Sequence, residues 1–241
     1  MFRIRRSATA FISALILLAG FATPVGVSAE TVAMIGTGQF GSALGPLLAG
    51  LGHEIIYGSR SPDREDVQAL VAATGGGASA TTPLAAASQA DIVVIALPWD
   101  VAEEVVRGLG DLSGKIIIDP INPRIVGEDG FADYPSYTSN AERIQNIAPG
   151  AKVVKAFSTI SVDTMVDPGL VDHPLTIPLV GNDPEAKAVV AEICEALGFE
   201  TLDFGPVRYA HVVEGLYLLR ANSRLYDEYF EWSYPRSRRS R

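Results

Sequence analysis

Short runs of consecutive apolar residues alternate along the chain with longer amphipathic segments, which predicts buried β-strands separated by helices. The first run, TVAMI at residues 31–35, ends at a glycine-rich turn. Apolar runs with helices between them indicate a parallel sheet that is covered on both faces. We therefore expect an α/β, Rossmann-like, doubly wound and mostly parallel sheet. Its further strands are expected at residues 53–57, 78–81, 92–97, 115–119 and 152–157.

The segment after residue 160 repeats this alternation on a smaller scale. In its first helix, which Asp183 should begin, apolar side chains recur at helical spacing and predict a buried face. We expect a small C-terminal α/β subdomain with a basic tail over residues 161–241, beside a main nucleotide-binding domain over residues 30–160. The expected C-terminal elements are strands at 177–180 and 201–204 and helices at 184–197 and 207–219.

The first 29 residues have the three-part layout of a secretory signal peptide. Three arginines precede an apolar stretch that extends from residue 8 to about residue 20, and the small residues at 27–29 form a cleavage motif. Because this stretch is shorter than the ~20 residues that span a bilayer, we expect cleavage after Ala29 and no stable membrane span afterwards. The sequence thus predicts an exported, periplasmic protein, or a cytoplasmic one if the signal is not used.

Composition excludes several classes of function. Residues 30–235 hold 12 Lys and Arg against 28 Asp and Glu, because the other basic residues lie at the two ends of the chain. Such an acidic body repels nucleic acid and anionic lipid, so neither is an expected partner. Cys194 is the single cysteine and the three histidines are scattered, so no disulfide and no metal site is expected. No nucleophile–base set or carboxylate pair is apparent, so no catalytic side chain is assigned.

A glycine-rich turn opens the first helix, and its sequence GTGQFG matches the GxGxxG fingerprint of dinucleotide-binding folds. The first glycine permits a tight turn, the second lets the backbone approach a pyrophosphate, and the third lets the helix lie close to the strand. The helix should run to about Leu51 and be kinked or shortened at Pro46. The candidate cofactor-binding residues here are Gly36, Thr37, Gly38, Gln39, Phe40 and Gly41.

The end of the second strand indicates which dinucleotide is bound. NAD-binding proteins carry an acid about 20 residues after the glycines, where it bonds the ribose 2′-hydroxyl. Here the chain reads Gly58-Ser59-Arg60, and Arg64 should follow one turn into the next helix. Hydroxyl and guanidinium groups bind a 2′-phosphate that a carboxylate would repel. The sequence therefore predicts NADP(H) rather than NAD.

Other candidate binding residues follow the remaining strands. Ligands of open α/β sheets bind beyond the carboxyl ends of the strands, where these residues should gather. Trp99 could stack on a bound ring or pack at the rim, and the two alternatives remain open. We expect His211 to be a surface or packing histidine. The residues at these strand ends are Leu97, Pro98, Trp99, Asn122, Ser158 and Thr159.

Taken together, these motifs resemble those of the NADP-dependent oxidoreductases that use a deazaflavin, coenzyme F-420. The matching stretches extend from residue 31 to about residue 208. The same module is similar to the cytosolic domain of six-transmembrane metalloreductases, which pass hydride from NADPH to a flavin. The stretches are IGTGQFGSAL, LGHEIIYGSR, ALPWD, IDPINP, VVKAFSTI and GNDPEAK followed by LGFETLDFGPVR.

The resemblance implies a role for each half of the predicted site. Thr37, Ser59, Arg60 and Arg64 would hold the 2′-phosphate. The nicotinamide would lie near Pro98, Trp99, Asn122 and the Ser158-Thr159 turn, and a second cofactor would bind in a cleft that the C-terminal part closes. Family members often have Asn at the position of Ser158, and the last thirty residues match the family poorly.

Three functions fit these observations. The leading hypothesis is an NADP(H)-dependent oxidoreductase whose partner is a small-molecule acceptor of the deazaflavin or flavin type, since hydride transfer needs two rings held about 3–3.5 Å apart rather than an acid–base pair. The second is a non-catalytic, exported NADP(H)-binding protein. An imine or β-hydroxyacid reductase ranks lowest, because only about 80 residues follow Ile160. Aromatic residues at 226–232 could cap the cleft or bury against a second subunit of a homodimer.

Overall fold

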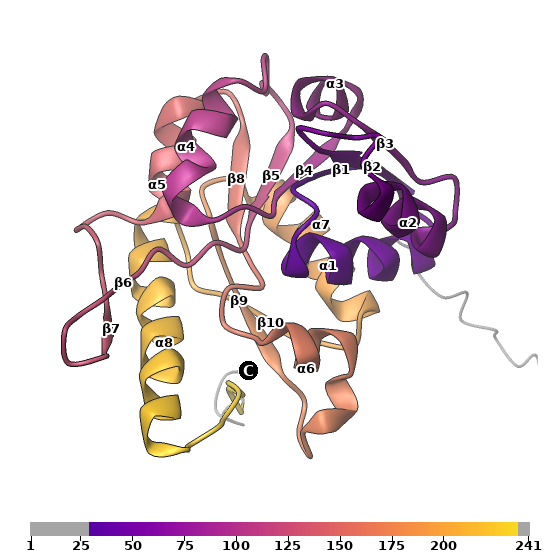
Figure 1. Cartoon of the computed structure of the whole chain (residues 1–241). Coiled ribbons are helices and arrows are strands. Elements are labelled where there is room, and N and C mark those ends of the chain that lie inside the picture. Colours follow the sequence, from indigo (N-terminus) through magenta and orange to yellow (C-terminus); the bar gives the residue numbers. More distant parts are fainter. Residues whose placement is uncertain (1–28, 236–241) are drawn as a thin grey trace, which may run out of the picture.

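The computed structural model describes residues 29–235, so the expected signal peptide up to residue 28 and the basic tail from residue 236 lie outside the described residues. The strands of the main sheet are β1 (Thr31–Ile35), β2 (Glu54–Gly58), β3 (Ser79–Thr81), β4 (Ile92–Ile95), β5 (Ile116–Asp119), β8 (Lys152–Lys155), β9 (Thr176–Gly181) and β10 (Glu200–Asp203). They form one eight-stranded sheet in the order β10-β9-β8-β5-β4-β1-β2-β3 (Figure 1).

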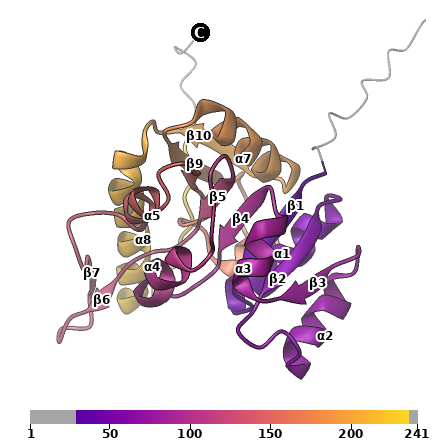
Figure 2. The same cartoon turned by 90° about the horizontal axis from the view of Figure 1, so that it is seen from above.

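Helices flank this sheet on both faces (Figures 1 and 2). They are α1 (Gln39–Gly50), α2 (Glu65–Thr74), α3 (Pro83–Gln89), α4 (Trp99–Arg107), α5 (Asn140–Ile147), α6 (Val162–Val166), α7 (Pro184–Ala196) and α8 (Ala210–Ser223). Short 3-10 helices occur at Pro168–Leu170, Val207–Tyr209 and Arg224–Tyr226. The predicted α/β, mostly parallel architecture with flanking helices is confirmed.

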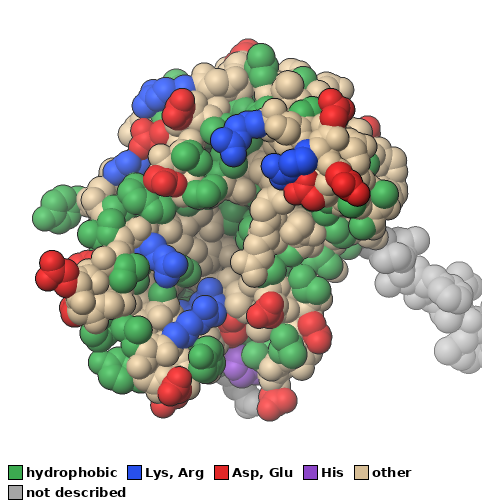
Figure 3. Space-filling view, in the orientation of Figure 1, with side chains coloured by type: hydrophobic (Ala, Val, Ile, Leu, Met, Phe, Trp, Pro, Cys, Tyr) green, Lys and Arg blue, Asp and Glu red, His purple; other side chains and the backbone are tan. Residues whose placement is uncertain are grey.

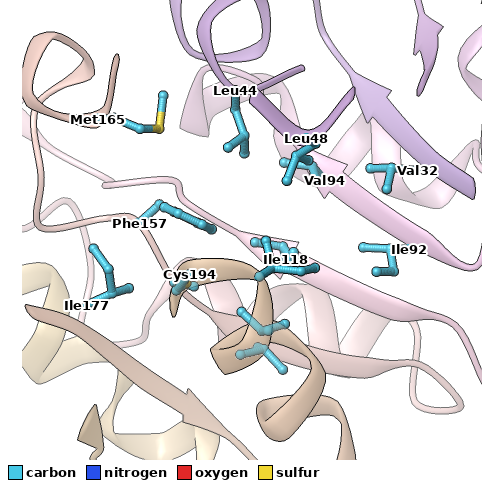
Figure 4. Close-up of a cluster of buried hydrophobic side chains, with 14 of the residues drawn as sticks. Val32, Leu44, Leu48, Ile92, Val94, Ile118, Phe157, Met165, Ile177 and Cys194 are labelled. Carbon is cyan, nitrogen blue, oxygen red and sulfur yellow. The ribbon is translucent and has the colours of Figure 1, made fainter. Parts of the chain in front are cut away.

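Alternation along the central strands divides the core into two layers. In β1, Val32 and Met34 point to the layer that contains α1, α6 and α7, and Ala33 and Ile35 point to the layer that contains α3, α4 and α5. All four side chains are fully buried, so both faces of the strand are covered. Figure 4 shows the first layer, where Cys194 of α7 lies among apolar side chains, as expected of a small buried residue. Burial of each large apolar side chain contributes roughly 1.5–3 kcal/mol.

Strand direction reverses once across the sheet. β1 pairs in parallel with β2 on one side and with β4 on the other, so the order of the strands, though not their direction, runs two ways from β1. β9 pairs antiparallel with β8, and β10 is parallel to β9. The predicted C-terminal strands and the helix between them are therefore present, and they extend the main sheet rather than form a second one.

Local sequence explains where several elements begin. Asp183 begins α7 as expected, since its Oδ1 accepts a bond of 2.8 Å from the Ala186 N–H. α1 continues through Pro46 to Gly50, so the proline does not shorten the helix as we had considered. A two-stranded hairpin, β6 (Ile125–Val126) with β7 (Ala132–Asp133), and α5 were not predicted. Across residues 29–235, no helix is both long and apolar enough to span a bilayer.

Candidate functional site

The loop between β1 and α1 has the backbone that its glycines require. Gly36 has φ of +112°, and a Cβ there would lie 2.2 Å from the Ala96 carbonyl oxygen. A Cβ at Gly41 would lie 2.2 Å from the Gly36 oxygen, which explains the close approach of helix and strand. Gly38 is the N-cap of α1, and a Cβ there would meet nothing within 4 Å. The loop thus leaves open space in front of the first N–H groups of a twelve-residue helix, where anions bind.

The end of β2 presents one arginine that no other side chain holds. Ser59 is nearly buried, its N–H donates to the Thr81 carbonyl oxygen at 2.9 Å, and its Oγ accepts from the Ser61 N–H at 3.2 Å. Arg60 is exposed, and within residues 29–235 its guanidinium has no hydrogen bond or ion pair. A free guanidinium beside a hydroxyl at this strand end fits a 2′-phosphate.

Arg64 differs from the expectation. It is the N-cap residue of α2 rather than one turn into the helix, and its guanidinium forms an exposed, two-pronged pair with Asp66, with Nη2 to Oδ2 at 2.8 Å. The pair raises the pKa of Arg64 and lowers that of Asp66. Asp66 therefore pairs with the Arg64 guanidinium, which was predicted to bind the 2′-phosphate of NADP(H). Thr37 lies half-buried in the glycine loop.

The next strand ends form an apolar rim. Leu97 and Trp99 are half-buried and pack against the second core layer, and Pro98 is the exposed N-cap residue of α4. Trp99 packs at the rim, and its stacking on a bound ring stays a prediction. A half-buried indole also keeps part of its surface open to a ligand.

The turns after β5 and β8 meet each other. Asn122 Nδ2 donates to the Ser158 carbonyl oxygen at 2.7 Å, so the two predicted nicotinamide-side turns lie in contact. Three buried oxygens here have no hydrogen-bond partner within residues 29–235, namely Asn122 Oδ1, Ser158 Oγ and Thr159 Oγ1. Buried polar atoms are nearly always paired, so this cluster indicates a place where a polar ligand or water completes the bonding.

Phe157 links this cluster to the glycine loop. It has φ of +61°, a left-handed conformation that costs a non-glycine residue about 1–3 kcal/mol. Its ring packs edge-to-face on Phe40 with centroids 6.5 Å apart. Phe40 belongs to GTGQFG, so the strained turn and the phosphate loop are held together by a direct aromatic contact.

A buried ionic network lies beneath the two turns, and sequence reasoning missed it. Lys155 Nζ at the end of β8 contacts Asp119 Oδ2 at 3.1 Å and Glu214 Oε1 of α8 at 2.7 Å, and it also donates to the Ile121 carbonyl oxygen. Glu214 Oε1 accepts from the Asn140 N–H at 2.9 Å. The only sequence signal was a charged residue at the end of each of two buried strands, KVVK and IIID.

Burial shifts the ionisation of this network. Burial raises the pKa of Glu214 to about 7, against the opposing effect of Lys155. Burial alone would lower the pKa of Lys155, but the two carboxylates raise it above its ordinary value. Because Asp119 Oδ1 also accepts from the Ile121 N–H at 3.0 Å, the network fixes the turn that carries Asn122.

The surface of the molecule is hollowed in one place. Figure 3 shows it at the centre of the molecule, with Lys and Arg side chains on two sides of it. α8 lies on one side and α6 on the other (Figure 1). A second depression, of about 460 Å³, lies at the opposite edge of the sheet near Asp91, Lys115 and Lys152, away from the glycine loop. Within the described range, no group of three His, Cys, Asp or Glu could hold a metal ion.

The fold and this site are those of a Rossmann-type dinucleotide-binding domain, and the relatives of this chain are NADP-dependent oxidoreductases. More particularly, residues 31–123 match the model of the family described as "NADP oxidoreductase coenzyme F420-dependent". The resemblance inferred from the sequence is confirmed.

Two curated relatives illustrate the range of this similarity. The metalloreductase STEAP3 of Rattus norvegicus is 30% identical over 188 residues, which cover 78% of this chain and 36% of the relative. The F420-dependent NADP reductase of Methanocaldococcus jannaschii is 28% identical over 138 residues, which cover 54% of this chain and 60% of the relative. The chain thus spans between about a third and three fifths of these relatives.

Solved structures extend the comparison. A protein from Arthrobacter sp. described as an F420-dependent NADP-reductase superposes with a TM-score of 0.75 at 29% identity, covering 83% of this chain and 94% of that one. A hypothetical protein from Sinorhizobium meliloti gives 0.64 at 30% identity, covering 76% and 89%. An imine reductase from Streptomyces aurantiacus gives 0.59 at 17% identity, covering 81% and 62%, and shares the fold alone.

Proposed function

We propose that the protein transfers hydride between NADP(H) and an acceptor of the deazaflavin or flavin type. The observation that carries this proposal is the contact of two half-sites at one edge of the sheet. The first half-site is the glycine loop with its neighbours Ser59 and Arg60, and the second is the Asn122–Ser158 pair. The contact between Phe40 and Phe157 joins the two. Bound NADPH supplies the hydride. Hydride transfer between two rings requires positioning, and the linked half-sites support this task.

The residues present have separate tasks in this proposal. The first turn of α1 binds the pyrophosphate through backbone N–H groups, and Arg60 and Ser59 bind the 2′-phosphate. Asn122, Ser158 and Thr159 offer unpaired oxygens that orient a carboxamide by accepting its N–H groups. Leu97 and Trp99 give the same edge an apolar rim that excludes water from the reacting rings.

One observation favours a second candidate, a non-catalytic NADP(H)-binding protein. Ser158 stands where relatives of the resembling family often carry Asn, and its Oγ is buried without a partner in the described part of the chain. A serine side chain is shorter than that of asparagine and offers one oxygen in place of an amide group. Cofactor binding without turnover is the result that this candidate predicts.

An acceptor screen tests the proposal. Purified protein is mixed with NADPH and, separately, with coenzyme F-420, flavin mononucleotide and riboflavin, and the loss of NADPH absorbance is followed. We expect turnover with at least one acceptor and none in the variant Arg60→Asp, with Arg208→Ala as an exposed-arginine control that retains activity. Tight NADPH binding in the absence of any turnover would establish the non-catalytic candidate instead.

We also propose that the protein is exported, on the pattern of residues 1–29 alone. Fractionation of cells that express the full chain, with antibodies against the body of the protein, should find a periplasmic species shortened by 29 residues. Removal of residues 2–29 should return the protein to the cytoplasm. A full-length cytoplasmic species from the complete gene would contradict the proposal.

A further inference from the structure

Tyr217 of α8 lies between two arginines. The guanidinium carbon of Arg124 is 5.9 Å from the centroid of its ring, and that of Arg220 is 5.8 Å away. Both distances are within the range of cation–π contact. The tyrosine is half-buried, Arg124 is exposed and Arg220 is buried, so the arrangement has one fixed cation and one that faces solvent.

This trio adjoins both turns of the predicted nicotinamide side. Arg124 follows Asn122 by two residues. Arg220 Nη2 donates to the Ile160 carbonyl oxygen at 3.1 Å, directly after Thr159. One turn earlier on α8, Glu214 reaches Lys155 at the carboxyl end of β8. Tyr217 therefore lies on the part of α8 that adjoins the turns after β5 and β8.

The charge around Tyr217 is unbalanced on an acidic protein. Of the twelve Lys and Arg in residues 29–235, seven form ion pairs with carboxylates, but Arg124 and Arg224 do not. Arg220 pairs with Glu231 at 3.1 Å. Burial, and to a lesser extent the charge of Arg224, lowers the pKa of Arg220. Of these three arginines, Arg220 alone pairs with a carboxylate within the described residues.

We propose that Arg124 and Tyr217 form a binding site for the phosphate-bearing chain of the hydride acceptor. The inference rests on the proposed function and names the class of acceptor that the site selects. The guanidinium of Arg124 offers bidentate hydrogen bonds that match a phosphate, and the ring of Tyr217 holds the guanidinium plane and gives the chain an apolar surface. A flavin nucleotide and a phosphorylated deazaflavin both carry an anionic phosphate on the chain attached to the ring, which is the group that this site would bind.

Arg124 has no evident structural task that competes with this assignment. Its side chain is exposed and makes no hydrogen bond or ion pair with any residue of the described range. Arg220, by contrast, holds Ile160 and Glu231 in place. In the proposed function, Arg60 binds the 2′-phosphate of the nicotinamide cofactor at the far end of the glycine loop. Arg124, which lies beside α8, therefore remains to bind the acceptor.

The test compares ligands with and without the phosphate: flavin mononucleotide and riboflavin differ in this group alone, and coenzyme F-420 and its riboside differ in the whole phosphate-bearing chain. Full-length mature protein saturated with NADP⁺ is titrated with flavin mononucleotide and with riboflavin, and dissociation constants are measured by fluorescence anisotropy at low salt. The same measurement is made with coenzyme F-420 and its phosphate-free riboside. We expect the phosphate-bearing member to bind at least tenfold more tightly in at least one pair, and Arg124→Ala to remove that preference while the other member's affinity is unchanged.

Arg208→Ala is the matched control. Arg208 is exposed and also stacks on a tyrosine, with its guanidinium carbon 4.9 Å from the Tyr209 ring, but it precedes the start of α8 at the other edge of the sheet. This variant should keep the full preference for phosphate. Equal affinity for both members of each pair, no binding of any of the four ligands, or an equal loss in the two arginine variants would overturn the proposal. Because binding is measured with NADP⁺, the result is independent of whether turnover occurs.

Discussion

Lys155→Met should reveal how much the turn beneath Asn122 depends on the buried ionic network. Lys155 is fully buried, and among residues 29–235 it supplies the one cation that touches both Asp119 and Glu214. Methionine fills a similar volume but leaves two carboxylates buried without a counter-charge. Breaking a buried pair by removing one partner costs about 3–5 kcal/mol, and we expect a loss of that size in the free energy of unfolding at pH 8.

The loss should be smaller at pH 5, and the sign follows from Glu214. Its pKa is raised in the folded state to about 7 from an ordinary 4.5, so the folded protein holds a proton that the unfolded chain releases between these values. Stability from this group is present at low pH and is lost as the pH rises. Without Lys155 the pKa of Glu214 rises further, which adds roughly 1 kcal/mol to the loss for each pH unit above 7.

Urea unfolding followed by circular dichroism at pH 5 and pH 8 measures these free energies. Lys152→Met is the control, because Lys152 lies on the same strand but its pairs with Asp183 and Glu185 are partly open to solvent and contribute about 1 kcal/mol or less. If Lys155→Met does not fold, Glu214→Gln carries the test, since it should flatten the decline of stability between pH 5 and pH 8. Equal losses in the two lysine variants, or a pH-independent loss, would refute the reasoning.

Two further predictions concern packing. In urea unfolding, Gly45→Ala in α1 should lower the free energy of unfolding by about 1–3 kcal/mol, because the new Cβ would lie 2.1 Å from the Tyr57 hydroxyl. Gly50→Ala, whose Cβ would meet nothing within 4 Å, should raise the free energy of unfolding by roughly 0.5 kcal/mol. The reverse order would mean that α1 does not sit against β2 as described. Cys194 is fully buried, which raises its pKa, so the native protein should not react with a thiol reagent until denaturant is added. Rapid labelling of one thiol in native conditions would contradict this burial.

The sheet was predictable because its signals are local. Runs such as IVVI and IIID are apolar on both faces, and each ends at a turn residue, so both the strands and the edge that binds ligands could be read from the sequence. GTGQFG and Gly58-Ser59-Arg60 could be assigned because glycine conformation and side-chain charge are properties of those residues alone.

The remaining features depend on contacts between distant segments. Lys155 and Glu214 are 59 residues apart, and nothing in either stretch announces their pairing. Arg64 was assigned to the phosphate because its charge is visible in the sequence, while its capture by Asp66 depends on the exact start of α2. The hairpin strands β6 and β7 have two residues each, too few for a pattern.

One missed element had a usable signal. α5 begins with a capping box, in which Ser139 Oγ accepts from the Glu142 N–H and the Glu142 carboxylate accepts from the Ser139 N–H. The capping-box motif Ser-x-x-Glu, which predicts the start of a helix, is present in the sequence SNAERIQNI. Its helix matters to the site because the Asn140 side chain donates to Asp119 Oδ1 at 3.0 Å.

Coenzyme preference is the measurement that tests the central claim most directly. Dissociation constants for NADPH and NADH are determined by fluorescence titration for the wild type and for Arg60→Asp. If Ser59 and Arg60 bind the 2′-phosphate, the wild type should favour NADPH, and the variant should lose roughly a hundredfold in NADPH affinity while NADH affinity changes little. Equal weakening of both coenzymes, or no change in either, would contradict the account.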